Sequence, residues 1–367
     1  MSRLAVRLIA VLTLCFVSHS SIAADLSAAR YRLTDLGDLT SDRAHGVTFV
    51  SGINKKGDIV GQTFNDQSRA RAFLWQKGRM TDLGDLGAVN GQPPILSAFA
   101  VNDDSQVVGT SMGAKSPSPI RAFYWDHGRI SDLGTLRGVG LDTFATSIND
   151  HGDIVGAGYR SPGDLRALRW VKKAPQELGG LTDGRVAVQA FGISEHGDIV
   201  GYLSPGGVVS FAHAFVWTKG KVTDLGTLPG TNLSIANAVN EHRQVVGQSL
   251  NTRAPGTGRA FLWEDGSLLD LGKAAAKHTS SEARAINKNG TVVGVSGAGS
   301  VTVAWIWREG VIKDLNTLIA TDDPNRAFVQ LVKAAGVNET EQIVAQGYDK
   351  RRGSAFVRGY LLTPVKK

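Results

Sequence analysis

Three short sequence blocks recur along this chain at a regular spacing, and this repeat constrains the fold more than any other feature. One block is Asp-Leu-Gly or a close variant, whose seven copies lie 44–50 residues apart. The copies begin at Asp35, Asp82, Asp132, Glu177, Asp224, Asp270 and Asp314. A second block is Ala-Phe-Leu-Trp or a variant, and a third joins Ile/Val-Asn to Val-Val-Gly or Ile-Val-Gly. This period predicts a fold built from similar small units.

Each repeat has the pattern of four short β-strands. The second block and Asp-Leu-Gly are separated by a residue followed by glycine, as in Lys77-Gly78 and His127-Gly128. Such a pair between apolar runs is typical of a tight hairpin, because glycine adopts positive φ without steric cost. The Asn of the third block predicts a second turn, since its side chain can bond its own backbone. No segment has a sustained 3.6-residue apolar period, so we expect an all-β protein.

The two ends of the chain indicate a closed ring. Tyr31–Gly37 matches the last strand of a repeat, whereas Ala355–Leu362 matches a third strand with no fourth strand after it. A ring closes when the surplus N-terminal strand supplies the fourth strand that is missing at the C-terminus. The alternative, an open β-solenoid, gains nothing from this arrangement of the ends and leaves sheet edges exposed. We therefore predict a seven-bladed β-propeller of four-stranded blades. Residues 25–367 form this single domain, closed by pairing of the N- and C-terminal strands.

Residues 1–24 have the pattern of a secretory signal peptide. Two arginines precede an apolar core, Leu8–Val17, and small residues then predict cleavage after Ala23 or Ala24. The core is too short to span a bilayer, which needs about 20 apolar residues. An uncleaved anchor or a buried helix is the alternative. We expect a secreted protein that is periplasmic or extracellular after cleavage.

Composition excludes several classes of function. Cys15 is the only cysteine and lies in the signal core, which excludes a disulfide scaffold, a cysteine zinc site and a catalytic cysteine. Removal of the two signal arginines reduces the 40 basic residues to 38, against 33 acidic ones, a net charge of +5. Because no basic tract occurs, nucleic acid is not expected as a partner. No later segment reaches membrane-spanning length, and no cofactor or metal motif is found.

The repeats resemble one known family. His213-Ala-Phe-Val-Trp, with Asp224-Leu-Gly-Thr-Leu and Val245-Val-Gly, is similar to the HAF repeat family of extracellular, mostly bacterial repeat proteins. The resemblance covers residues 31–362. One departure is that the leading His occurs only at His213; the equivalent residues elsewhere are Arg71, Arg121, Arg166, Arg259, Val303 and Ser354. The resemblance implies a secreted repeat fold and no known reaction.

The basic residue before Ala-Phe and the Asp of Asp-Leu-Gly come nearest to a chemical signature. If Lys77-Gly78 is a two-residue turn, Phe73 lies opposite Asp82, and Arg71 can lean diagonally towards Asp82. We favour the interpretation that such pairs fix strand register within each blade. The alternative is a ring that binds an anionic ligand, for example an acidic glycan. The candidate residues are Arg71, Arg121, Arg166, His213 and Arg259.

Two other residue types also repeat. His151, His196 and His242 share one turn position. A metal site or a pH-sensitive rim is the functional alternative, but we expect solvated turn residues, because blades pack about 10 Å apart and metal–imidazole bonds are about 2 Å. The tryptophans are predicted to pack between blades rather than to stack on sugars. They are Trp75, Trp125, Trp170, Trp217, Trp263 and Trp307.

Specific function is expected in the long loops, because these share no sequence between repeats. They are Asp85–Ser97, Ser111–Ile120, Thr135–Thr146, Leu203–Ala212, Leu250–Gly258 and Asn316–Lys333. We predict a monomeric, non-catalytic binding module with a protein or glycan ligand on a loop-bearing face, and nominate no catalytic residue or cofactor. One alternative is a propeller enzyme, a glycoside hydrolase or polysaccharide lyase, which requires an asymmetric cluster of ionisable residues in the axial funnel. A structural component of the cell envelope is the other.

Overall fold

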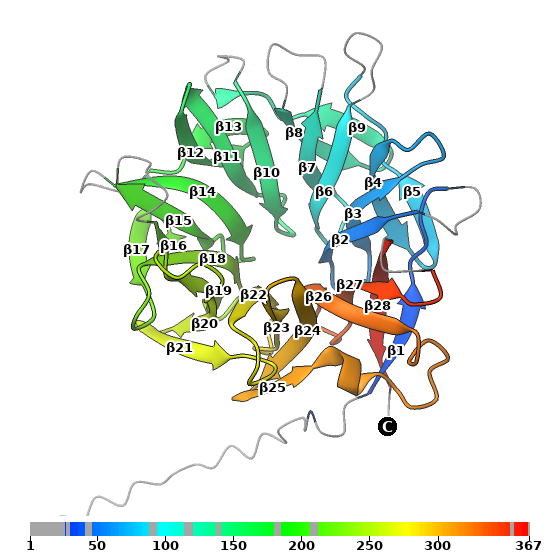
Figure 1. Cartoon of the computed structure of the whole chain (residues 1–367). Coiled ribbons are helices and arrows are strands. Elements are labelled where there is room, and N and C mark those ends of the chain that lie inside the picture. The colour runs from blue at the N-terminus through cyan, green and yellow to red at the C-terminus, as the bar shows by residue number, and fades with distance from the viewer. Residues whose placement is uncertain are drawn as a thin grey trace, which may run out of the picture.

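Figure 1 shows the computed structural model, in which seven four-stranded antiparallel sheets surround a central axis. The predicted seven-bladed β-propeller with almost no helix is confirmed. The structure describes residues 26, 30–40, 46–87, 94–113, 120–136, 141–179, 185–205, 212–352 and 356–365. The predicted signal peptide, with Cys15, and parts of the long loops lie outside these residues. Within them, no helix has the length and apolar character needed to cross a membrane.

In the first six blades the strands follow chain order from the axis outwards (Figure 1). Blades 1 and 2 comprise β2 (Thr48–Ile53), β3 (Ile59–Phe64), β4 (Ala70–Gln76), β5 (Arg79–Asp82), β6 (Ile95–Val101), β7 (Val107–Met112), β8 (Ile120–Asp126) and β9 (Arg129–Asp132). Blades 3 and 4 comprise β10 (Thr143–Ile148), β11 (Ile154–Ser161), β12 (Asp164–Val171), β13 (Ala174–Glu177), β14 (Arg185–Ile193), β15 (Ile199–Pro205), β16 (His213–Thr218) and β17 (Lys221–Gly226). Blades 5 and 6 comprise β18 (Leu233–Val239), β19 (Val245–Leu250), β20 (Arg259–Glu264), β21 (Ser267–Gly272), β22 (Ser280–Ile286), β23 (Val292–Ala298), β24 (Val301–Arg308) and β25 (Val311–Asp314). A 3-10 helix, η3 (Leu315–Leu318), follows β25.

The seventh blade is assembled from both ends of the chain, as predicted. Its strands are β26 (Val329–Val337), β27 (Ile343–Asp349), β28 (Val357–Pro364) and, outermost, β1 (Tyr31–Asp35). β1 pairs with β28 along its whole length, from Tyr31 opposite Pro364 to Asp35 opposite Tyr360. The ring is therefore closed by hydrogen bonds between strands that lie at opposite ends of the sequence.

The sequence alignment of the seventh blade was wrong by four residues. Tyr360 lies opposite Asp35 as Phe73 lies opposite Asp82, so Arg358 occupies the position of Arg71. The sequence pattern predicts Ser354 for this position, a residue outside the described part of the chain. The cause is a chance Ala-Phe pair upstream, whereas the true copy of the block reads Gly-Tyr-Leu-Leu and keeps only the leucine of Ala-Phe-Leu-Trp.

The repeated tryptophans are buried, and the core lies between blades as predicted. In one cluster, Val60 and Leu74 of blade 1 pack against Phe123 and Trp125 of blade 2. Burial of each such side chain contributes about 1.5–3 kcal/mol. Tight hairpins hold the outer strands in register: Lys77-Gly78 has φ values of 48° and 87°, and Phe73 pairs with Asp82. The hairpin signal and its register are thus both confirmed.

Candidate axial binding site

The two faces of the propeller carry different connections. Turns from the first to the second strand of a blade and from the third to the fourth lie on one face, which we call the turn face. Connections from the second to the third strand and from one blade to the next lie on the other, the loop face. The alternating strand directions place the strand ends that flank all six long loops on the loop face. A ligand recognised by these loops would therefore approach from that side.

A β-bulge in every innermost strand supplies one extra residue next to the axis. In β2, Val50 pairs with Gly61 and Gly52 pairs with Val60, which leaves Ser51 as the extra residue. The bulge brings a carbonyl oxygen of β2 so close that a Cβ on Gly61 would lie 2.0 Å from it. In blades 1 to 6 the glycine of this block therefore serves close backbone approach and not a turn, whereas blade 7 has Ala345 at this position.

The bulge residues and the residues two positions before them form two layers around the axis. The bulge layer comprises Ser51, Phe99, Thr146, Phe191, Asn237, Arg284 and Ala335. The second layer, nearer the loop face, comprises Phe49, Ser97, Phe144, Gln189, Ile235, Glu282 and Lys333. All of these residues except Ile235 and Glu282 line an axial cavity of about 750 Å³. The blade frame repeats, but its axial residues vary from blade to blade.

Blades 1 to 4 give this cavity an aromatic wall. Each contributes one phenylalanine, namely Phe49, Phe99, Phe144 and Phe191. Phe99 retains 37% of its surface exposed, and the other three are half-buried. Phe191 contacts Tyr202, with ring centroids 6.0 Å apart. Aromatic surface left uncovered in a concave site is typical of ligand binding.

Blades 5 to 7 give the opposite part of the lining a polar and charged character. Arg284 Nη1 donates to Glu282 Oε1 at 2.7 Å, and Asn237 Nδ2 donates to the same oxygen at 3.2 Å. Lys333 lies in the neighbouring blade, in the layer of Glu282. Among the described residues that line the cavity, the charged ones are Arg284 and Lys333, both cations. This is the asymmetric ionisable cluster that the sequence alone did not locate.

The environment of Lys333 in the folded protein disfavours its charged form. Burial lowers its pKa below the ordinary value, and the positive charge of Arg284 lowers it further, against an opposing contribution from Glu282. No hydrogen bond of its Nζ to another described residue is found. A perturbed, unpaired cation in a cavity is a frequent mark of a functional site.

On the turn face, the repeated asparagine does more than start a turn. Asn54 Oδ1 accepts from the backbone nitrogens of Lys56 and Asp58, as predicted, but its Nδ2 donates to the carbonyl oxygen of Asn102 in the next blade at 2.8 Å. The same link recurs from Asn102, Asn149, Asn240, Asn287 and Asn338. Blade 4, where Ser194 replaces asparagine, lacks the side-chain amide needed for the link. The motif thus joins neighbouring blades around the axis.

Ion pairs cross part of the turn-face end of the channel. Lys55 Nζ lies 2.7 Å from Asp150 Oδ2 and 3.5 Å from Asp103 Oδ2, so it connects blades 1, 2 and 3. Although burial acts to lower the pKa of Lys55, the hydrogen bond and charge of Asp150 raise it above its ordinary range. Access to the aromatic wall is therefore favoured from the loop face.

The five predicted ring residues lie on the third strands of their blades, two strands outwards from the axis. Each has a carboxylate partner in its own blade. Arg71 Nε lies 2.8 Å from Asp82 and its Nη1 lies 3.1 Å from Asp85. The other pairs are Arg121–Asp132, Arg166–Asp164, His213–Asp224 and Arg259–Asp270. The predicted cross-strand pairing is confirmed in blades 1, 2, 4 and 5. In blade 3, Arg166 pairs with Asp164 of its own strand. The anionic-ligand ring stays a prediction.

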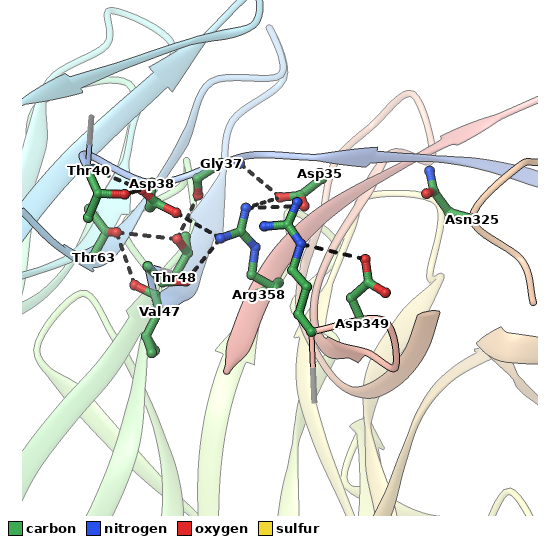
Figure 2. A network of polar contacts seen from close by, with 12 residues as sticks. Asp35, Gly37, Asp38, Thr40, Val47, Thr48, Thr63, Asn325, Asp349 and Arg358 are labelled. Carbon is green, nitrogen blue, oxygen red and sulfur yellow. Dashed lines mark hydrogen bonds and ion pairs between the residues drawn. The ribbon is translucent and has the colours of Figure 1, made fainter. Parts of the chain in front are cut away.

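The seventh blade contains a sixth pair of this kind (Figure 2). It is far more deeply buried than the pair of Arg71 and Asp82. Arg358 is 2% exposed and Asp38 is fully buried; Arg358 Nη1 donates to Asp38 Oδ2 at 2.7 Å and its Nη2 to Asp35 Oδ1 at 3.0 Å. A further bond runs from Nη1 to the carbonyl oxygen of Gly46. This network ties β28 to the N-terminal segment that closes the ring.

The repeated turn histidines do not come together in a metal site. His151 is exposed, with its Nδ1 3.7 Å from Glu195, and His196 and His242 belong to separate blades. Within the described residues, no group of three or more His, Cys, Asp or Glu side chains has the arrangement to hold a metal ion.

The axial residues do not repeat from blade to blade, so the repeated sequence blocks do not reveal them. A signal exists: the bulge residue always lies two positions before the Ile or Val of the third block. At this fixed position the repeats differ most in chemistry, from serine and alanine to phenylalanine and arginine. Variation at a constant position within a constant frame is the pattern expected for a site formed jointly by all the repeats.

The fold and its axial channel define a closed seven-bladed propeller, and comparisons place it among known propellers by fold alone. No protein-family model and no curated protein matches the chain. Solved structures do, at 10–12% identity: an oligogalacturonate lyase in complex with manganese (TM-score 0.54, 10% identity, 93% of this chain and 95% of that chain). A second is the propeller domain of the Trilobed protease from Pyrococcus furiosus (TM-score 0.52, 10% identity, 87% of this chain and 95% of that chain). A third is YCF48 bound to D1 peptide (TM-score 0.51, 12% identity, 92% of this chain and 97% of that chain).

Proposed function

We propose that this protein is a non-catalytic binding propeller whose ligand enters the axial channel from the loop face. The observation that supports it is the lining of the channel, where four phenylalanines of blades 1 to 4 share a cavity of about 750 Å³ with Arg284 and Lys333 of blades 6 and 7. Cavities of roughly 300–1,000 Å³ with mostly apolar walls and a few polar groups are typical ligand sites. The variable loops around the same mouth would add specificity for a protein or glycan.

We further propose that the chain is a secreted member of the HAF repeat family. The support is the set of three linked blocks over residues 31–362 and the signal-like pattern of residues 1–24. Expression of the full chain in a bacterial host tests secretion: a periplasmic product that has lost the first 23 or 24 residues is expected. Retention of the intact N-terminus in the cytoplasm would contradict it.

The binding function is tested with the mature protein on a glycan array and a displayed peptide library, together with a screen for polymer degradation. We expect binding without turnover. Ser51→Trp fills the channel from a bulge position, and it should abolish binding. Thr81→Trp, on exposed outer strand β5, is the matched control and should leave binding intact. Turnover of any polymer would refute the non-catalytic function, and equal binding by both variants would exclude the channel as the site.

One observation favours a second candidate, a uronate lyase: the ionisable cluster is asymmetric. Arg284 would bind the uronate carboxylate, and neutral Lys333 would take the proton from the adjacent carbon. As the C–O bond to the leaving sugar breaks and a C=C bond forms, the protonated amine would return its proton to the leaving oxygen. We place this second because phenylalanine offers sugar hydroxyls no hydrogen bonds. Ultraviolet absorbance of an unsaturated product from pectate or alginate, lost in Lys333→Gln, would establish it.

A further inference from the structure

The two cations in the axial cavity retain unused hydrogen-bond donors. Arg284 has five N–H donors, and the one bond of its guanidinium to a described residue goes to Glu282. Lys333 contributes three more donors, and its ammonium group has no hydrogen bond to a described residue. Cationic donors held in this way are positioned to bind an anion.

The net charge of this site matches a ligand with a single negative charge. Arg284, Lys333 and Glu282 sum to +1 when Lys333 is protonated, and Glu282 is engaged by Arg284 and Asn237. The remaining lining residues of the cavity carry no charge. A monoanionic group would neutralise the site, whereas a dianion would leave an excess negative charge in a partly buried position, which is costly.

The phenylalanine wall of the cavity indicates the chemistry of the rest of the ligand. The four phenylalanine rings of blades 1 to 4 offer apolar surface and no hydrogen-bonding group, so they favour a flat apolar body over a hydroxyl-rich one. We infer that the axial site binds a small amphipathic monoanion, with its carboxylate at Arg284 and Lys333 and an aromatic or flat apolar body against the phenylalanine wall. This inference rests on the proposed binding function and specifies its ligand class.

A pair of fluorescent probes tests the role of the charge in the wild-type protein. Dansylglycine carries a carboxylate, and dansylamide has the same aromatic body without it. We expect dansylglycine to bind about 10- to 100-fold more tightly, as two charge-assisted hydrogen-bond partners would give. Equal affinities, or no binding of either probe, would overturn the inference without use of any variant.

Variants then locate the site. Lys333→Gln and Arg284→Gln should each remove most of the preference for dansylglycine while leaving dansylamide binding unchanged. Phe144→Ala should weaken both probes about equally, since it removes apolar contact alone. Lys221→Gln, an exposed lysine of outer strand β17, is the matched control and should change neither affinity. If Lys333→Gln and Lys221→Gln behaved alike, the anion would not bind where we place it.

The outcomes separate this inference from the proposed function. If glycan or peptide binding is lost in Ser51→Trp but the two dansyl probes bind equally, the ligand class is wrong and the axial binding function stands. If dansylglycine binding survives Ser51→Trp, the probe binds elsewhere and the inference is refuted, while array binding alone decides the proposed function.

Discussion

Arginine occurs in two settings in this propeller, and they differ in what repeats. On the outer strands, an arginine or histidine pairs with a carboxylate of its own blade in six of the seven blades, including the pair formed by Arg358. In the channel, Arg284 occurs at a position that holds serine, phenylalanine, threonine, asparagine or alanine in the other blades. The repeated pairs are already satisfied and hold strands together, whereas the singular arginine faces a cavity.

This difference separates scaffold from site in the molecule. A pair that serves the internal geometry of one blade is useful in every blade, so it recurs. A ligand that lies on the axis meets all blades at once, and each blade can contribute a different group. The frame is therefore symmetric while the lining of the channel is asymmetric.

The largest effect is expected where a repeated pair has become buried. Arg358→Met should lower the free energy of unfolding by about 3–5 kcal/mol, because it leaves Asp38 buried without its cation. Arg259→Met is the control in the same strand position of blade 5, where both partners are 35% exposed, and should cost at most about 1 kcal/mol. Denaturant unfolding measures both. Equal losses would show that ring closure gains nothing from the buried pair.

A smaller effect is expected from the bulge that shapes the channel. Gly201→Ala would place a Cβ 1.9 Å from the carbonyl oxygen of Gln189, so the innermost strand of blade 4 must shift. We expect a loss of about 1–3 kcal/mol, as for other overpacked sites. Gly179→Ala, at a glycine with no atom within 4 Å of the added carbon, should be near neutral. Denaturant unfolding of both variants is the measurement, and similar stabilities would contradict the close-approach role.

The sequence predicted the parts of the molecule that follow from local chemistry. Hairpins such as Lys77-Gly78 and the pairing of Arg71 with Asp82 each depend on residues close in one blade. The burial of the tryptophans was predicted from their fixed place in every repeat. Closure by the terminal strands was also predictable, because it depends on counting strands. The register of β28 was not, since Gly359 and Tyr360 replace the motif residues while an unrelated Ala-Phe pair precedes them.

The candidate site could not be predicted in the same way. Arg284, Lys333 and Phe99 come together because seven blades meet at one axis, and no local pattern encodes that meeting. The bulge that places them is also hidden, because its visible mark, the glycine of Val-Val-Gly, lies on the neighbouring strand and resembles an ordinary turn residue.

On the channel side, removal of the Lys333 charge should stabilise the fold while abolishing anion binding. Lys333→Met is expected to gain about 1 kcal/mol at neutral pH, in the way that functional sites trade stability for activity. The pKa of Lys333 is lower in the folded protein than in the unfolded chain. Below the folded-state pKa, the charged Lys333 therefore destabilises the folded state. This destabilisation disappears as the pH rises towards the ordinary pKa of about 10.4. The gain in denaturant unfolding should therefore shrink between pH 7 and pH 10. A destabilised variant, or a gain that grows with pH, would contradict this.

On the scaffold side, Asp82→Ala should cost about 0.5–1 kcal/mol and leave ligand binding unchanged. The loss is small because Asp82 is partly exposed and Arg71 keeps its contact with Asp85. Thermal unfolding and the binding array measure the two effects separately. Lost binding of an acidic glycan at unchanged melting temperature would instead support the ring of outer arginines and histidine as an anion site.

The smallest effect is expected when the asparagine link between neighbouring blades is introduced into blade 4, which lacks it. Ser194 is buried at the position where the other six blades have asparagine, and among the described residues the one bond that its hydroxyl accepts is the turn bond from the backbone nitrogen of Asp198. Ser194→Asn should keep this turn bond and add the missing link to the carbonyl oxygen of Asn240, with a gain of about 0.5–1 kcal/mol. Asn54→Ser, which removes the equivalent link in blade 1, should lose a similar amount. Denaturant unfolding of both variants measures the difference. If Ser194→Asn instead destabilises the protein, blade 4 is built differently from its neighbours at the axis. Variation between blades would then occur on the turn face as well as in the channel lining.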